Sequence, residues 1–162
     1  NFTSNGESLT LREVIRRVEH THRDPLETLP SLASMALELR RLTSDTVHPS
    51  ECADYALTTA RCRLERTESV RQASDGQRFV DVWFGDIVAN ALAVVERIYA
   101  TIGLDLSASV RDKMERYVAG HGRDKRPAHG YTLAQFGLDV EAIRREFSAY
   151  RETYVLPHQR RE

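Results

Sequence analysis

The chain has 162 residues, of which 41% are hydrophobic and 29% are charged. This length and composition are typical of one soluble globular domain, or of part of a larger one, and they exclude a disordered chain. The 23 basic and 24 acidic residues leave a net charge of −1, which argues against general affinity for nucleic acid or for an anionic membrane surface. No run approaches the roughly 20 apolar residues of a membrane span.

The N-terminal part of the chain contains a predicted strand followed by a predicted helix. Residues 1–10 are polar and rich in turn formers, and we expect them to be loose. A β-compatible run at 16–22 predicts a strand. Asp24 is a favourable N-cap, and Glu27 three residues later completes the pattern of a capping box, so a helix is predicted over 25–42.

The rest of the chain combines one more strand with several helices. The run at 78–84 is rich in β-branched and aromatic residues and is the best strand candidate in the sequence. Apolar periodicity and end signals predict four further helices, at about 51–72, 89–102, 107–119 and from 139 onward, the last one capped by Asp139. A short capped turn is predicted at 132–135.

The two cysteines, Cys52 and Cys62, are too few for a disulfide framework. They lie ten residues apart in a helical pattern, and we expect both to be reduced thiols packed in a cytosolic protein. No signal peptide is visible in the sequence, and the expectation of reduced thiols corresponds to a cytoplasmic location.

The two predicted strands, at 16–22 and 78–84, are separated by two predicted helices. A connection of this length is what parallel pairing requires. Parallel sheets occur almost only as several strands covered on both faces, and two strands alone would bury too little. We therefore expect residues 1–162 to form a single partial domain, the C-terminal part of an α/β fold whose other strands precede this sequence.

The strand–loop–helix segment around Arg23 is the most informative candidate for ligand binding. A loop that leaves the carboxyl end of a parallel strand and opens a helix is where α/β folds bind anionic ligands. Arg23 stands at that point, and Ser31 follows about two helical turns later, so the two could hold a phosphate by charge and hydrogen bonds. The spacing alone also fits a structural role, in which Arg23 pairs with Asp24 or Glu27.

Three other groups could carry chemistry. His20 and His22 point to the same side of a strand, a spacing that can bind zinc, but a histidine pair without a third ligand is more often packed or hydrogen-bonded. The loop at 121–130 contains three cations and could form a second anion clamp or a solvated surface loop. Trp83 and Phe84 end a strand, where an aromatic ring could stack on a base or pack into the core.

Several catalytic and phosphate-binding motifs are absent from the sequence. None of its eight glycines belongs to a P-loop, a Gly-x-Gly-x-x-Gly fingerprint or a Gly-x-Ser-x-Gly elbow. The sequence therefore contains no self-contained catalytic constellation.

Three segments occur in an order and spacing that resemble a known family. Residues 20–34 read His-Thr-His-Arg-Asp-Pro-Leu-Glu-x-x-Pro-Ser-Leu-Ala-Ser, residues 79–89 read Phe-Val-Asp-Val-Trp-Phe-Gly-Asp-Ile-Val-Ala, and residues 129–138 read His-Gly-Tyr-Thr-Leu-x-x-Phe-Gly-Leu. They resemble the 3′-phosphate-binding segment, the strand ending in Tyr-Glu-Asp-Leu and the C-terminal helix pair of bacterial sulfotransferases. Those enzymes transfer a sulfuryl group from 3′-phosphoadenosine 5′-phosphosulfate (PAPS). The resemblance covers about residues 16–154.

The resemblance assigns roles to individual residues. Arg23 and Ser31 match the family's arginine and serine that bind the 3′-phosphate of the donor. Phe84 stands where many members have a tyrosine near the adenine, and Gly85 replaces the acidic residue that follows it. Three cations lie near the family's basic loop over the cofactor phosphates, namely Arg123, Lys125 and Arg126.

The resemblance also implies a fold and an activity. The fold is a P-loop-type parallel-sheet fold of three layers, of which this chain is the C-terminal part, mostly helical with about two strands. The activity is sulfuryl transfer from PAPS to a hydroxyl or amine of a small-molecule acceptor, without a metal. The catalytic residues and the loop that binds the 5′-phosphosulfate are expected upstream, so this chain alone is expected to be inactive.

Two other functions remain open at this point. One is a non-catalytic binding or interaction module that retains the second half of the fold. The other is a nucleotide-dependent kinase, which the Arg-Asp-Pro and Tyr-Thr-Leu-x-x-Phe-Gly-Leu features disfavour. The expected partners are the nucleotide and the acceptor, with no nucleic acid and no membrane, and homo-oligomerisation is left open. The acceptor cannot be predicted, because acceptor pockets are built from variable loops.

Overall fold

The computed structural model describes residues 2–4, 7–9, 18–74, 79–120 and 130–159, and for residues 2–4, 7–9 and 18 it describes the backbone alone. Within it the chain divides into two compact units. Unit 1 comprises Asn1–His22 and Arg71–Ala128, and unit 2 comprises Arg23–Val70 and His129–Glu162.

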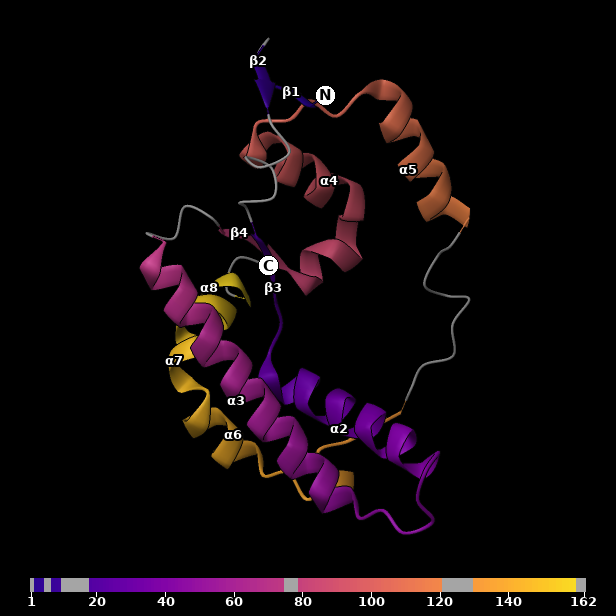
Figure 1. Cartoon of the computed structure of the whole chain (residues 1–162), viewed down its shortest axis with the longest axis vertical. Coiled ribbons are helices and arrows are strands. Elements are labelled where there is room, and N and C mark those ends of the chain that lie inside the picture. Colours follow the sequence, from indigo (N-terminus) through magenta and orange to yellow (C-terminus); the bar gives the residue numbers. More distant parts are fainter. Residues whose placement is uncertain (1, 5–6, 10–17, 75–78, 121–129, 160–162) are drawn as a thin grey trace. The chain divides into compact units, whose positions relative to one another are not determined.

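The parallel pairing of the two predicted strands is confirmed in unit 1. β3 (Val18–His22) and β4 (Phe79–Trp83) pair in parallel, in register from Val18 opposite Phe79 to His22 opposite Trp83 (Figure 1). Because parallel strands run in the same direction, both carboxyl ends lie at one edge of the sheet. The next residues in the chain are Arg23 after β3 and Phe84 after β4.

The helix predicted at 89–102 begins earlier than expected and is interrupted. α4 (Phe84–Ile102) follows β4 directly, but the backbone of Asn90 is non-helical (φ −156°, ψ 86°). The Asn90 side chain accepts a hydrogen bond from the Ala93 N–H at 3.0 Å, so it acts as the N-cap of the second segment. That second segment is the one that the apolar periodicity predicts. Gly103 ends the helix in the left-handed conformation, with φ 73°, which glycine adopts without strain.

Unit 1 contains little buried apolar surface among its described residues. Three valines of β4 and α4 form a buried cluster, namely Val80, Val82 and Val94. Partly buried isoleucines of α4 pack against them, namely Ile87, Ile98 and Ile102. The predicted helix at 107–119 is present as α5 (Ala108–Gly120), and none of its residues is buried.

The expectation that residues 1–10 are loose differs from the structure. β1 (Phe2–Ser4) and β2 (Glu7–Leu9) pair antiparallel, with Phe2 opposite Leu9. The sequence between them is Asn-Gly at positions 5 and 6, which is the strongest short-range signal for a hairpin. The Asn-Gly pair therefore indicates the hairpin, whereas the polar composition of the segment indicates a loose chain, and the structure agrees with the Asn-Gly pair.

Unit 2 is built on two long helices that match the predicted ones. α2 (Pro25–Arg41) begins after Asp24, whose side chain accepts a hydrogen bond from the Leu26 N–H at 3.0 Å. This confirms Asp24 as the N-cap. α3 (Pro49–Ala73) follows, and its last turn, from Arg71, is assigned to unit 1.

The C-terminal region of unit 2 is a series of short helical segments. The predicted capped turn is a 3₁₀ turn, η2 (Ala134–Phe136). Asp139 caps the next helix by accepting a hydrogen bond from the Ala142 N–H at 2.6 Å, as predicted. The single predicted helix is divided into four consecutive segments, which are α6 (Val140–Glu146), α7 (Ser148–Tyr150), a π-helical turn η3 (Arg151–Val155) and α8 (Leu156–Gln159).

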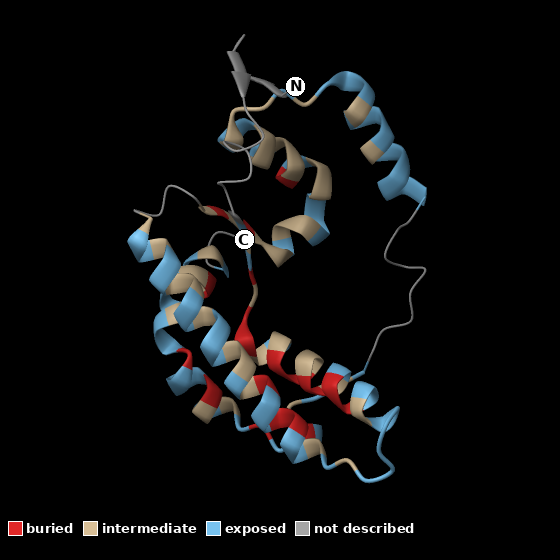
Figure 2. Cartoon of the chain, in the orientation of Figure 1, coloured by how far each residue is buried: buried red, intermediate tan, exposed pale blue. Residues whose placement is uncertain are grey.

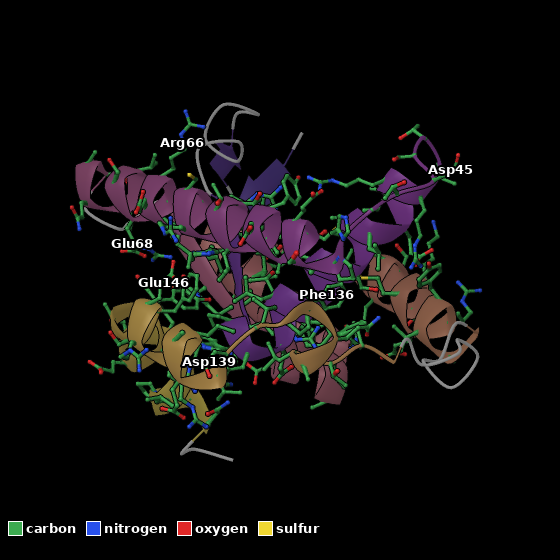
Figure 3. All side chains as sticks on the ribbon, turned by 90° about the horizontal axis from the view of Figure 1, so that it is seen from below. Asp45, Arg66, Glu68, Phe136, Asp139 and Glu146 are labelled. Carbon is green, nitrogen blue, oxygen red and sulfur yellow. The ribbon has the colours of Figure 1, made fainter. Side chains whose placement is uncertain are left out.

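The core of unit 2 lies where α2, α3 and the C-terminal segments meet, and Figure 2 shows the buried residues gathered on their facing sides. Polar contacts at the edge of this core join α3 to the C-terminal segments (Figure 3). Arg61 donates to Glu146 with an Nε–Oε1 distance of 2.8 Å, and Tyr154 donates to Glu68 at 2.9 Å. The core contains eleven buried side chains, namely Leu29, Ala33, Ala36, Leu37, Cys52, Ala53, Ala56, Phe136, Leu138, Ile143 and Phe147.

Both cysteines are free thiols in α3, but only one is packed as predicted. Cys52 is fully buried in the core of unit 2, whereas Cys62 is exposed. Ten helical residues rotate the chain to about 80° away from the starting direction, so the narrow buried stripe of α3 cannot include both. None of the described helices is long and apolar enough to cross a membrane.

Candidate functional site

The entry into α2 is held by Asp24, which has two roles. Asp24 is 7% exposed and caps α2 through Leu26. Arg151 of η3 also binds it with two nitrogens, at Nε–Oδ1 3.1 Å and Nη2–Oδ2 2.9 Å. A forked guanidinium–carboxylate pair with little exposure fixes the geometry of both partners. Asp24 therefore ties the start of α2 to the C-terminal region of unit 2.

Sequence reasoning identified Asp24 as a cap but did not identify Arg151. The two residues lie 127 positions apart, and the chain has 23 basic residues that could serve as partner. One local signal was present, because an N-cap aspartate that becomes buried needs a cation to offset its charge. That signal predicts that a partner exists but not which arginine it is.

Arg23 stands directly before this capped helix start. Its Nε donates to the Glu27 carboxylate at 2.8 Å, and the two side chains are 30% and 55% exposed. The structural alternative considered for Arg23, a pair with Glu27, is therefore the arrangement observed. An exposed pair of this spacing contributes little to stability, so an anion with more negative charge can compete with Glu27 for the guanidinium.

Ser31, the second predicted phosphate ligand, is half-buried in α2, six residues after the helix begins at Pro25. The N-terminus of this 17-residue helix carries a partial positive charge from its aligned peptide dipoles. Arg23 and the α2 N-terminus therefore offer positive potential at the same end of the helix. The role of both residues in binding phosphate stays a prediction.

Phe84, the predicted adenine contact, lies in unit 1 as the first residue of α4 and is half-buried. It follows Trp83, whose ring lies 5.5 Å from the ring of His22, centroid to centroid. Trp83 and Phe84 therefore follow one another at the carboxyl edge of the sheet. The predicted basic residues of the loop, Arg123, Lys125 and Arg126, lie outside the described residues.

His20 and His22 are joined by two charged residues that the sequence analysis did not single out. Arg71 donates to both carboxylate oxygens of Asp81, at Nη1–Oδ2 3.0 Å and Nη2–Oδ1 2.5 Å, and also to His20 Nδ1 at 3.2 Å. His22 Nε2 lies 2.8 Å from Asp81 Oδ1. We refer to these four side chains as the Arg71 network. All of them belong to unit 1.

The electrostatics of the Arg71 network favour an ionised Asp81. Desolvation of the partly buried carboxyl raises its pKa, but the hydrogen bonds and charges of Arg71 and His22 together outweigh this effect. The pKa of Asp81 therefore lies below its ordinary value. An ionised carboxylate can only accept hydrogen bonds. His22 Nε2 therefore carries a hydrogen and donates a hydrogen bond to Asp81.

The Arg71 network also affects whether His20 and His22 could bind zinc. His20, His22 and Asp81 place one ligand atom each within 4.8 Å of one another. Zinc would need a lone pair from each of them. Arg71, however, donates to His20 Nδ1 and to both Asp81 oxygens, so a second cation would have to displace a guanidinium. The geometry favours the hydrogen-bonded interpretation of the pair over the metal-binding one.

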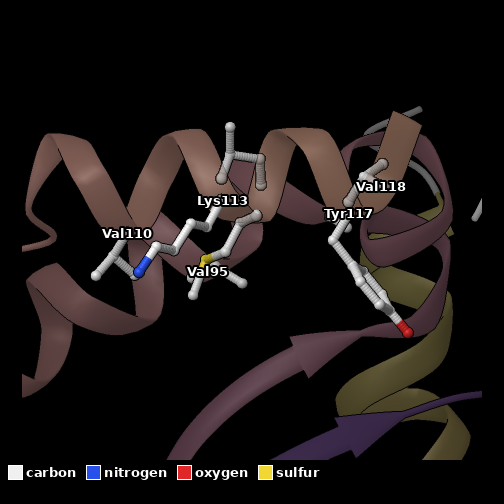
Figure 4. A pocket seen from close by; sticks show the side chains of 8 residues that line it. Val95, Val110, Lys113, Tyr117 and Val118 are labelled. Carbon is white, nitrogen blue, oxygen red and sulfur yellow. The ribbon is translucent and has the colours of Figure 1, made fainter. Parts of the chain in front are cut away.

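A separate apolar groove lies between α4 and α5 in unit 1 (Figure 4). It has a volume of about 420 Å³, within the range of small-molecule pockets. Lys113 is the one charged side chain among its lining residues, which are otherwise apolar or aromatic. Among the described residues, this lining does not include the several cations that a nucleotide with two anionic ends requires.

Comparison with known proteins agrees with the segments that carry the sequence resemblance. A model of the sulfotransferase family matches residues 17–108, which is more than half of the chain. The chain belongs to the sulfotransferase family. The match includes β3, the start of α2, the Arg71 network and β4. No curated protein matches the chain significantly.

Two solved structures are similar to this sulfotransferase-family chain. The crystal structure of sulfotransferase STF9 from Mycobacterium avium has a TM-score of 0.75 and 26% identity, over 83% of this chain and 35% of that chain. Sulfotransferase STF1 from Mycobacterium tuberculosis H37Rv has a TM-score of 0.68 and 29% identity, over 82% of this chain and 33% of that chain. The fold prediction is thereby confirmed, and the chain spans about a third of the length of these structures.

Proposed function

We propose that this chain forms the part of a PAPS-dependent sulfotransferase that holds the 3′-phosphate and the adenine of the donor. The observation that carries the proposal is the position of Arg23. It follows the carboxyl end of a parallel strand and directly precedes the capped start of a long helix. Anionic ligands bind at this position in parallel α/β folds.

Each ligand contact follows from ordinary physical chemistry. The Arg23 guanidinium presents a fork of donors that matches a phosphate, and the α2 N-terminus adds positive potential. The Ser31 hydroxyl supplies a further donor. The Phe84 ring supplies an apolar face for the adenine, although it lacks the hydroxyl of the tyrosine that is common at this position. Arg123, Lys125 and Arg126 are proposed to cover the phosphates.

Sulfuryl transfer itself is proposed for a longer protein in which this chain is the C-terminal portion. Transfer requires that donors stabilise the charge on the moving group and that a base takes the proton of the acceptor. The sequence contains no glycine-rich loop of the kind that binds a terminal phosphate or sulfate. The proposed reaction is the transfer of a sulfuryl group to a hydroxyl or amine of a small molecule, and this chain alone is expected to be inactive.

A titration with adenosine 3′,5′-bisphosphate, the product of the donor, tests the binding role. Arg23→Ala is expected to weaken binding by about 2–4 kcal/mol, the cost of removing one partner of a charged hydrogen-bonded pair. Arg23→Lys is expected to recover part of this loss, because lysine restores the charge without the fork. Binding is measured by calorimetry or by NMR titration of the chain.

Arg66→Ala is the matched control, because Arg66 is an exposed arginine of α3 and is expected to have no effect on the affinity. An Arg23→Ala variant that binds as tightly as the wild type would remove Arg23 from the site. Turnover of the sulfuryl donor by this chain alone would contradict the proposal that it is only a portion of the catalytic domain. Binding without turnover also fits the second candidate, a non-catalytic module that retains the second half of the fold.

A further inference from the structure

Arg71 connects both strands of the sheet through one side chain. It donates to both oxygens of Asp81 on β4 and to His20 Nδ1 on β3. Its Cζ atom also lies 4.2 Å from the centroid of the Phe79 ring, within range of a cation–π contact. The Arg71 side chain is only 14% exposed. A guanidinium with so little exposure is costly unless it is paired with an opposite charge, so the pair with Asp81 constrains where the strands lie.

The constraint acts on the register of the two strands. His20 lies directly opposite Asp81 in the ladder, and one guanidinium nitrogen contacts both residues. A slip of one residue would turn one of the two side chains to the other face of the sheet. The three-way contact exists only in the observed register.

The constraint continues to the carboxyl edge of the sheet. His22 is 1% exposed, lies 2.8 Å from the same Asp81 and contacts the Trp83 ring. His22 and Trp83 are the last residues of β3 and β4. The residues that follow them in the chain are Arg23 and Phe84, the two predicted contacts to the nucleotide.

We propose that Arg71 is a positioning residue for the adenine contact of the nucleotide, because it fixes the end of β4, which Phe84 of the same unit follows directly. Arg71 acts through Asp81 and the two histidines and does not itself contact the ligand. The inference rests on the proposed function, because it assigns a role toward the same nucleotide. It extends that function by giving the charged cluster behind the site a role in binding.

The arrangement has a spectroscopic signature that does not depend on any ligand. A guanidinium has donors only, so His20 Nδ1 must accept the hydrogen bond from Arg71. His20 is therefore neutral, with its proton on Nε2. In a long-range ¹H–¹⁵N spectrum of the labelled chain, His20 is expected to show an unprotonated Nδ1 and a protonated Nε2. A His20→Gln variant assigns the signal.

Two variants test the constraint itself. Arg71→Met removes every donor of the guanidinium and leaves the charge of Asp81 without its arginine partner. The double variant Arg71→Met/Asp81→Asn is therefore made as well, because it removes both charges of the pair. Both variants are expected to lose the fixed tautomer of His20. They are also expected to change the fluorescence of Trp83, the single tryptophan of the sequence. Arg66→Met on the same helix is expected to change neither signal.

Affinity for adenosine 3′,5′-bisphosphate tests the role in binding. The double variant is expected to bind about tenfold more weakly, the lower end of what the loss of an orienting partner costs at metal sites. Arg71→Lys is expected to give an intermediate affinity, and Arg66→Met the wild-type affinity. Wild-type affinity in a folded double variant, or a His20 signal with the proton on Nδ1, would overturn the role of Arg71. A wild-type chain that does not bind the bisphosphate would instead overturn the proposed function, and this role with it.

Discussion

The two units of the chain are stabilised in different ways. In unit 2, eleven buried side chains from α2, α3 and the C-terminal segments form one apolar core. In the described part of unit 1, the buried apolar cluster consists of three valines, and a nearly buried charged group, the Arg71 network, lies on the same pair of strands. Both units contain a forked arginine–carboxylate pair, Arg151–Asp24 in unit 2 and Arg71–Asp81 in unit 1, but among the described residues only unit 2 adds a large apolar core.

The difference shows what each kind of stabilisation can provide. Apolar burial is roughly proportional to area and has no direction, so the core stabilises unit 2 while the Asp24–Arg151 pair specifies the start of α2. Hydrogen bonds to Asp81 require particular distances and angles, so they specify the register of β3 and β4. In unit 1, whose described apolar cluster is the smaller one, these polar contacts specify the strand pair.

The largest effect is expected from a cavity in unit 2. Phe136 is 2% exposed in the core, and Phe136→Ala is expected to lower the free energy of unfolding by about 3–5 kcal/mol through lost burial and the cavity left behind. Urea unfolding followed by circular dichroism measures the change. Leu39→Ala is the control, because Leu39 of α2 is 58% exposed. Equal effects of the two substitutions would contradict the assignment of the core.

An intermediate effect is expected from acid on unit 1. Because the pKa of Asp81 is lower in the folded than in the unfolded state, the group stabilises the fold above its unfolded pKa of about 3.9. This contribution is lost as the pH falls through the lower folded pKa. The difference in unfolding free energy between wild type and Asp81→Asn is therefore expected to shrink between pH 6 and pH 3, as followed by Trp83 fluorescence.

In this measurement the other carboxylates titrate in both proteins and cancel in the difference. A difference that is constant with pH, or that grows as the pH falls, would mean that Asp81 is not held ionised by Arg71 and His22. The conclusion that an ionised Asp81 stabilises unit 1 would then be wrong.

The smallest effect is expected from the exposed pair at the start of α2. Glu27→Gln removes the charge that pairs with Arg23 and is expected to change the free energy of unfolding by no more than about 0.5 kcal/mol. The same variant frees Arg23 from a competing carboxylate and is expected to strengthen binding of adenosine 3′,5′-bisphosphate slightly. Stability is measured by urea unfolding and binding by calorimetry. A large loss of stability would place the pair among the structural contacts of unit 2.

The elements of the fold were largely predictable because their signals are local. Asp24 and Asp139 cap helices as predicted, since an N-cap bonds to a backbone N–H two or three residues away. β3 and β4 were predicted as a parallel pair from the length of chain between them. The first segment of α4, before Asn90, and the division of the last helix were not predicted.

The sequence by itself indicated the long helices, the parallel pairing of β3 and β4, and the resemblance to the sulfotransferase family. Only the tertiary structure decided that Arg71 binds Asp81 and His20, and that Arg151 binds Asp24. With 23 basic and 24 acidic residues, the sequence permits hundreds of ion pairs. Packing selects among them, because it brings together residues that lie between 10 and 127 positions apart and removes them from water.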